Sequence, residues 1–175
     1  METRSQTILT TMQVVFWVIF IGLCIKTGAL AVSLLVSLFV NADAARDLYM
    51  GLDLHALQTA SRRHYLGVGS LLLYLWGAKA YMAYLVTAIF AKLNFEQPFS
   101  PAVGGLIAQI SHAALGAGIV ALLAEGYSDW LLKRGLDAPG GWAGGEFLFL
   151  AGILFVVAQV FQKGIDLQSE HELTI

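Results

Sequence analysis

Four runs of apolar residues, each long enough to cross a bilayer, limit most strongly what this chain can fold into. The runs occupy residues 14–40, 65–90, 102–124 and 146–162. A helix rises 1.5 Å per residue, so about 20 apolar residues cross the hydrocarbon layer, which is about 30 Å thick. Lipid offers no hydrogen bonds, so each run must pair its own backbone groups as a helix. We therefore predict an all-α, integral membrane four-helix bundle that forms a single domain.

The composition leaves little of the chain for a soluble body. Hydrophobic residues make up 58% of the 175 residues and charged residues 13%, against about 25% charged residues in an average soluble domain. The net charge of −2 provides no basic surface, so direct binding to nucleic acid is not expected. The single cysteine, Cys24, cannot form an internal disulfide bond.

The sequence lacks motifs for catalysis or metal binding. It has no nucleophile–base pair, phosphate-binding loop or pair of catalytic carboxylates in a diagnostic context, so an enzyme is not expected. The histidines do not follow a metal-ligand spacing. His64 should lie at one end of the second run, whereas His112 lies inside the third run, which starts from the opposite side of the membrane. The two side chains would therefore differ in depth, which does not suit two axial ligands of one haem. We therefore expect neither a cofactor nor a metal.

Four polar side chains inside the apolar runs form a candidate intramembrane site. Lys26 and Lys79 each lie near the middle of a run, where a lysine costs about 2.5–3.5 kcal/mol on insertion scales. Such charges need a partner or a wet cavity, and two lysines at similar depth repel each other. Either one of them is neutral, or an anion or carboxylate lies between them. Gln109 and His112 suit hydrogen bonds between helices. Alternatively, the first helix tilts or breaks near Lys26, so that this lysine reaches the membrane surface.

The connections between the runs differ in length and polarity. Residues 42–58 are predicted to form a short helix on the membrane surface with four leucines against the lipid. These are Leu48, Leu52, Leu54 and Leu57. Residues 125–145 contain Pro139, Gly140 and Gly141 and are predicted to be a flexible loop.

The four tryptophans divide into two pairs by their position. Trp130 and Trp142 lie outside the apolar runs or at their ends, and we expect them at the membrane–water interface, where tryptophan is enriched. Trp17 and Trp76 lie within runs. We expect these two to pack against neighbouring helices.

Small residues recur every four positions on two of the runs, as they do in helices that approach closely. They are Ala29, Ser33 and Ser37 on the first run and Ala113, Ala117 and Ala121 on the third. Packing within the bundle is the leading interpretation, and a homo-oligomer is the alternative.

Four spans place both termini on one side of the membrane. That side carries Arg4, Lys92 and Lys163. The opposite side carries Arg46, Arg62, Arg63, Lys133 and Arg134. Basic residues gather on the cytoplasmic side, so the count of three against five slightly favours termini outside the cytoplasm.

The chain ends with the stretch GILFVVAQVFQKGIDLQSEHELTI, in which an apolar run is followed by a basic residue, a glycine and a polar segment. The positions that carry this pattern are Lys163, Gly164, Gln168, Glu170, Glu172, Leu173, Thr174 and Ile175. The stretch resembles the end of a bacterial membrane family called domain of unknown function 2975, whose members close with an apolar helix, a basic residue, a glycine and a polar helix that ends in an acidic-Leu-Thr-Ile/Val signature. The segment 94–100, NFEQPFS, and the four-span layout also resemble the family.

The resemblance implies a protein of the bacterial plasma (inner) membrane with cytoplasmic termini, against the charge count. Genes of this family often lie beside one for a small helix-turn-helix regulator, which implies a membrane partner that restrains or releases that regulator. We therefore expect a regulatory or sensory protein whose tail, residues 163–175, contacts a cytoplasmic partner. The partner-binding candidates are Lys163, Glu170, Glu172, Leu173, Thr174 and Ile175. The alternative is a small transporter or channel subunit with a polar path at Lys26, Lys79 and His112.

Overall fold

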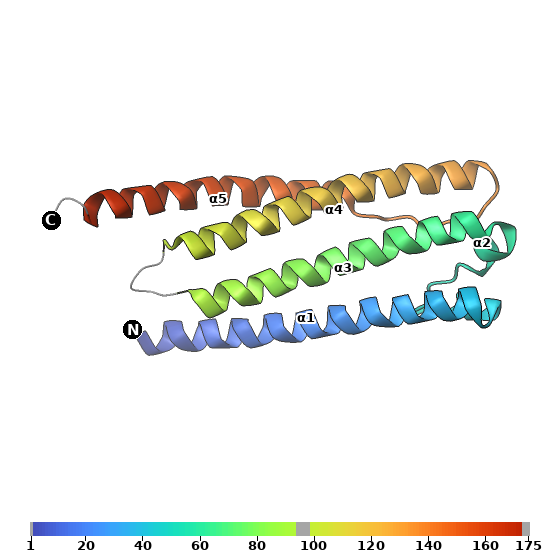
Figure 1. Cartoon of the computed structure of the whole chain (residues 1–175), viewed down its shortest axis with the longest axis horizontal. Coiled ribbons are helices and arrows are strands. Elements are labelled where there is room, and N and C mark those ends of the chain that lie inside the picture. The colour runs from blue at the N-terminus through green and yellow to red at the C-terminus, as the bar shows by residue number, and fades with distance from the viewer. Residues whose placement is uncertain (1, 94–98, 173–175) are drawn as a thin grey trace.

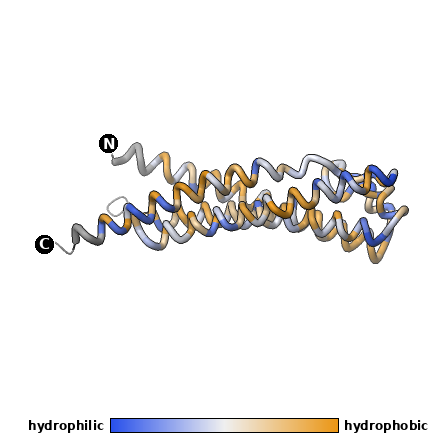
Figure 2. Tube along the Cα trace, turned by 90° about the horizontal axis from the view of Figure 1, so that it is seen from above, coloured by the Kyte–Doolittle hydropathy of each residue, from blue (hydrophilic) through white to orange (hydrophobic). Residues whose placement is uncertain are grey.

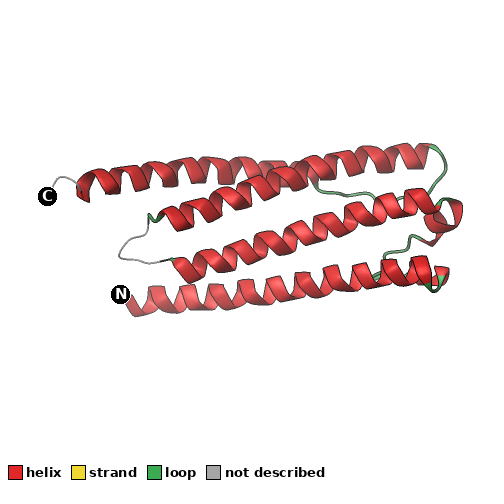
Figure 3. Ribbon diagram, viewed as in Figure 1, coloured by secondary structure: helices red, strands yellow, loops and turns green. Residues whose placement is uncertain are grey.

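The computed structural model describes residues 2–93 and 99–172, with the side chains of residues 7–93 and 99–168. Its elements are α1 (Glu2–Phe39), the short 3-10 helix η1 (Ala42–Arg46), α2 (His55–Ala60), α3 (Arg62–Lys92), α4 (Pro101–Lys133) and α5 (Gly144–Glu172). Among the described residues, four helices are long and apolar enough to cross a membrane: α1, α3, α4 and α5. The predicted all-α fold of membrane-spanning helices is confirmed (Figure 3).

The four long helices form a layer in chain order. α1 packs on α3, α3 on α4 and α4 on α5, and within the described residues α1 contacts neither α4 nor α5. Successive helices are antiparallel, so α1 begins and α5 ends at the same end of the molecule (Figure 1). The two longer connections gather at the other end, which we call the loop end. The layer therefore has two broad faces in addition to its two edges.

The helices extend past most of the predicted runs. Apart from Val40, each run lies inside one helix, and α4 continues nine residues beyond residue 124 to Lys133. Charged residues at helix ends remain in water or at the interface while the helix continues. Most of the hydrophilic colour in Figure 2 accordingly lies toward the two ends of the molecule. At its start, α4 is capped by the Ser100 side chain, which accepts a hydrogen bond from the Val103 N–H, and Pro101 occupies the first turn.

The first long connection folds into the protein, and not onto the membrane surface as predicted. Leu48, Leu54 and Leu57 are almost fully buried, and Leu52 packs against the same core. Only η1 and α2 are helical within residues 42–58. The leucines find apolar surface between α1 and α3, so a surface helix would gain nothing by placing them in lipid. The expectation of a single amphipathic helix is therefore wrong.

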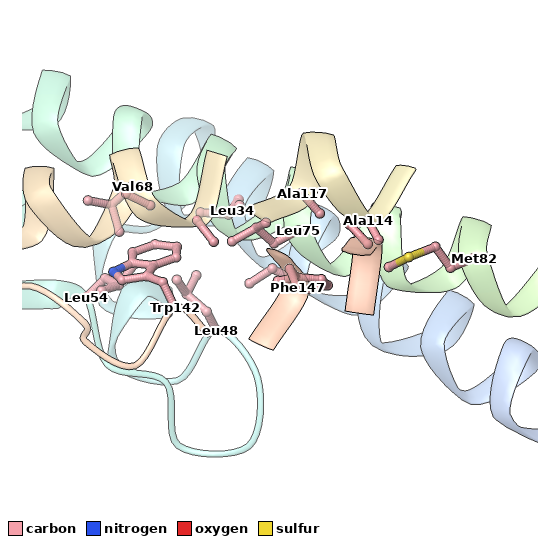
Figure 4. Close-up of a cluster of buried hydrophobic side chains, with 14 of the residues drawn as sticks. Leu34, Leu48, Leu54, Val68, Leu75, Met82, Ala114, Ala117, Trp142 and Phe147 are labelled. Atoms are coloured by element: carbon pink, nitrogen blue, oxygen red, sulfur yellow. The ribbon is translucent and has the colours of Figure 1, made fainter. Parts of the chain in front are cut away.

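The second long connection, residues 134–143, is anchored by Trp142. This side chain is 5% exposed, and its Nε1 donates hydrogen bonds to Ser128 Oγ at 2.9 Å and to the Pro139 carbonyl at 3.0 Å. Figure 4 shows its ring beside Leu54 and Val68. The expectation that Trp142 anchors at the interface is wrong, because a buried hydrogen-bond acceptor satisfies its indole N–H inside the protein.

Small residues on α4 pack inside the bundle, as the packing interpretation predicted for two residues of its stripe, Ala117 and Ala121. Ala117 and Ala121 are fully buried. A Cβ on Gly118 would lie 2.7 Å from a Leu148 side-chain atom, so only glycine allows this approach.

Candidate functional site

Lys26 and Lys79 meet around one aromatic ring. The Nζ of Lys26 lies 3.4 Å from the centroid of the Trp76 ring, and the Nζ of Lys79 lies 4.4 Å from the same centroid. Each lysine also lies near a second aromatic ring. The Tyr49 ring is 5.4 Å from Lys26, and the Phe147 ring is 5.5 Å from Lys79. The two ammonium groups therefore belong to one site built from α1, α3, α5 and the first long connection.

The two lysines lie at the same depth in the bundle. Leu34 of α1 packs on Gly69 of α3, and the rings of Phe20 and Tyr84 are 5.7 Å apart. In this antiparallel register, Lys26 falls opposite the α3 turn that precedes Lys79. α1 is a continuous helix from Glu2 to Phe39, so it does not break at Lys26.

The two lysines line one cavity of about 390 Å³. Its helical wall comes from α1 and α3, and its other wall comes from the two long connections. The lining residues are Lys26, Leu30, Tyr49, Met50, Gly51, Leu52, Leu72, Leu75, Trp76, Lys79, Pro139, Gly140, Gly141 and Trp142. The connections lie at the loop end, and Met50 is 83% exposed. The cavity therefore descends from the loop end toward the middle of the spans.

Irregular backbone of the two long connections forms the wall of this cavity nearest the loop end. Met50 and Gly51 have positive φ angles of 50° and 83°, and the Gly51 N–H is held by Asp47 Oδ1 at 3.0 Å. Gly141, with φ of 73°, plays the same part in the second connection. α5 starts at Gly144, which packs on Leu122, so these connections dip below the end of α4. Membrane proteins tolerate such backbone near the bilayer where it is buried or lines an aqueous cavity.

The described part of the chain provides no salt bridge to either lysine. Within the described residues, neither lysine has a carboxylate oxygen within 4.0 Å. Glu146, in the first turn of α5, interacts with Lys79 electrostatically but only from beyond that distance. Two lysines at mid-span cost about 2.5–3.5 kcal/mol each, and a cation over an indole recovers only about 0.5–2 kcal/mol. The remaining cost calls for water or an anion in the cavity, since each ammonium group has three N–H donors.

Gln109 and His112 do not join the lysines. Both are exposed on α4 and neither lines the cavity. Within the described side chains, neither makes a hydrogen bond. The structure thus separates the four intramembrane candidates into a lysine pair and a Gln109–His112 pair on different surfaces.

The partner-binding candidates lie at the end opposite the cavity. Lys163 is exposed on α5. Glu170 and Glu172 belong to the helical part of the tail, but their side chains are outside the described set. Leu173, Thr174 and Ile175 lie outside the described residues, as do residues 94–98 of the turn that resembles the family.

Trp76 and Tyr49 complete the site, and the sequence pointed to neither as a partner of the lysines. Trp76 precedes Lys79 by three positions, which places the two side chains on one helical face. That spacing could have identified Trp76 as a partner of Lys79 from the sequence. No sequence pattern could have identified Tyr49, because its position depends on how the first connection folds back.

Comparison with known proteins gives a family but no function. The family model described as Protein of unknown function (DUF2975) matches residues 58–175. The match covers α3, α4 and α5, including Lys79, and begins after α1 and Lys26. Neither the curated proteins nor the solved structures contain a match.

Proposed function

This chain belongs to the DUF2975 family, and we propose that it is a membrane sensor that binds a small anion between Lys26 and Lys79. One observation carries this proposal: two ammonium groups lie near the same Trp76 ring and their side chains line one cavity, with no carboxylate within 4.0 Å in the described part of the chain. Ammonium groups on flexible stems bind carboxylates and oxyanions as point charges. The ligand class is therefore a carboxylate or an inorganic oxyanion small enough for about 390 Å³.

The sensing step follows from where the two lysines are attached. Lys26 belongs to α1 and Lys79 to α3, and an anion between them would relieve their mutual repulsion. Binding would draw α1 and α3 together at this depth, and both helices continue to the end that carries the termini. A ligand shifts an equilibrium only through such differential contacts with two states. The proposed signal is a change in how α1 packs on α3.

The output side of the proposal concerns the tail. We propose that residues 163–175 contact a cytoplasmic helix-turn-helix regulator in a bacterial plasma membrane, as the family resemblance implies. With cytoplasmic termini, the cavity would open on the outer side and the tail would lie on the inner side. This arrangement suits a receptor for an external anion.

A direct binding experiment tests the ligand site. The protein in lipid nanodiscs is titrated with inorganic phosphate, sulfate, acetate and succinate, and heat is measured by calorimetry. We expect one of these anions to bind, Lys26→Met and Lys79→Met each to weaken it about 10-fold, and the double variant to abolish it, since each charge-assisted contact contributes about 1.5–3 kcal/mol. Lys92→Met, exposed at the end of α3, is the matched control. The proposal fails if no anion binds the unaltered protein or if the double variant binds equally well.

Labelling tests the orientation that the output side requires. In a Cys24→Ser background, a cysteine at position 169 should react only with reagent from the cytoplasm, and one at position 138 only from outside. The opposite pattern would eliminate contact between the tail and a cytoplasmic regulator. A pull-down of the regulator by the full chain, and its loss when residues 169–175 are deleted, would then test the partner itself.

Transport through the protein has less support. A polar path through Lys26, Lys79 and His112 needs these side chains on one surface, but His112 does not line the cavity. The cavity lining also comes from the loop-end half of the spans and the two connections. We therefore propose binding without passage.

A further inference from the structure

A second set of polar side chains lies on the opposite face of α3 from the lysines. Trp76 and Lys79 point to one side of this helix, whereas Tyr74 and Tyr81 point to the other, since successive residues turn by about 100°. Tyr74 and Tyr81 are each 48% exposed. They border a shallow groove of about 430 Å³ whose floor is Gly77 and Ala78 of α3 with Ala113 of α4.

Gln109 and His112 stand beside this groove at the same depth. They are one turn apart on α4 and exposed. Gly116, one turn after His112 on the same face of α4, lies beside the Tyr74 hydroxyl, since a Cβ on Gly116 would be 3.4 Å from that oxygen. We call the surface formed by Tyr74, Tyr81, Gln109 and His112 around Gly77, Ala78 and Ala113 the groove face. Because Gly77, Ala78 and Ala113 lie in the middle of their spans, the groove face would look into the hydrocarbon layer in a single copy.

Hydrogen-bonding groups in hydrocarbon need partners, and this chain supplies none of them on the groove face. Within the described side chains, Tyr74, Tyr81, Gln109 and His112 make no hydrogen bond. Four unpaired polar side chains facing lipid at this depth would be costly. The cost disappears if another protein surface covers them.

We propose that a second copy of this chain covers the groove face and forms a twofold symmetric dimer. Each of the four side chains both donates and accepts hydrogen bonds, so it can pair with its own counterpart or a neighbour's across a twofold axis. The groove face carries no Asp, Glu, Lys or Arg that would require an oppositely charged, different partner. Its small residues allow two copies of α3 and α4 to approach closely. This dimer is independent of anion binding, because the lysine cavity lies on the other face.

Cross-linking in membranes tests the geometry. In a Cys24→Ser background, Ala113→Cys should form a disulfide between two copies on mild oxidation. Gly152→Cys, on α5 and away from the groove face, is the control and should not. Equal cross-linking at both positions, or cross-linking of Ala113→Cys only to a different protein, would overturn the proposal.

The energetic test removes the polar groups. Dimer formation is measured by energy transfer between labelled copies in liposomes at increasing lipid dilution. Gln109→Leu with His112→Leu should raise the dimer dissociation constant by about 10-fold or more, because two hydrogen-bonding side chains are lost from each copy. Tyr74→Phe with Tyr81→Phe should raise it less while keeping the shape of the groove. Val156→Ala, exposed on α5 and outside the lining of the groove, should leave it unchanged. A protein that stays monomeric at every dilution, or a double leucine variant that associates normally, refutes the dimer.

Discussion

The helix layer has polar side chains at the same depth on its two faces, but their surroundings differ. We call the face with Lys26, Lys79 and Trp76 the cavity face, to distinguish it from the groove face. On the cavity face, two charged lysines are turned toward one indole ring, and two irregular connections cover them. On the groove face, four neutral polar side chains project beside glycine and alanine with nothing over them. Under our proposals, the first arrangement lacks only an anion, and the second lacks only a second copy of the chain.

This difference is our reason for proposing a ligand site on one face and an assembly site on the other. Charge in a bilayer is costly enough that the chain must build a local polar enclosure, and here the enclosure uses backbone as well as side chains. Neutral hydrogen-bonding groups cost less, and pairing between helices can satisfy them. Variants that act on one face should therefore leave the function of the other unchanged.

The largest effect is expected from Trp142→Ala, which removes the anchor of the covering connection. A buried tryptophan truncated to alanine costs about 3–5 kcal/mol, and the loss also frees Ser128, which is 2% exposed. The free energy of unfolding, measured by SDS titration in mixed micelles, should fall by that amount, and anion binding should fall with it.

Trp130→Ala is the matched control for this prediction. Trp130 is 38% exposed and stacks on Tyr127 and Arg134 at the surface. Its truncation should cost clearly less and should leave anion binding intact. Equal losses in the two variants would mean that Trp142 has no special role in covering the cavity.

The next effect has the opposite sign. Replacing both Lys26 and Lys79 with leucine removes two desolvated, mutually repelling charges, and buried charges exchanged for apolar residues often give a gain of about 1–4 kcal/mol. The same unfolding titration, without added anion, should therefore show higher stability for the double variant. Lys92→Leu should change stability little. A double variant less stable than the parent would make the lysines structural, with Trp76 as their fixed partner.

The sequence was sufficient for the helices, but it left open whether Lys26 stays near the middle of its span or reaches the membrane surface through a tilt or break of the first helix. Apolar runs of bilayer length leave the backbone no alternative to helix, so the spans and the all-α class follow from local composition. Lys26 and Lys79 were expected at similar depth because each lies near the middle of its run. Their contact with a common ring required the register of α1 on α3, which packing fixes and composition does not.

The connections could not be read in the same way. Residues 42–58 carry leucines at spacings that suit a surface helix, and the same leucines suit burial against α1 and α3. Local pattern does not distinguish lipid from protein as the apolar neighbour. Trp142 shows the same ambiguity, because its position near a span end fits both an interface anchor and a core residue bonded to Ser128.

The smallest effect tests whether Trp76 contributes charge stabilisation or only shape. Trp76→Phe keeps an aromatic face but weakens the attraction for the two cations, at a cost of about 0.5–2 kcal/mol. Affinity for the bound anion should rise slightly or stay the same, because the ammonium groups lose a competing partner. The free energy of unfolding without anion should fall slightly. If that loss persists when Trp76→Phe is combined with the double leucine variant, the ring acts through packing. If the loss disappears there, the ring acts on the charges, and the enclosure of the cavity face rests on cation–π contacts that the groove face does not have.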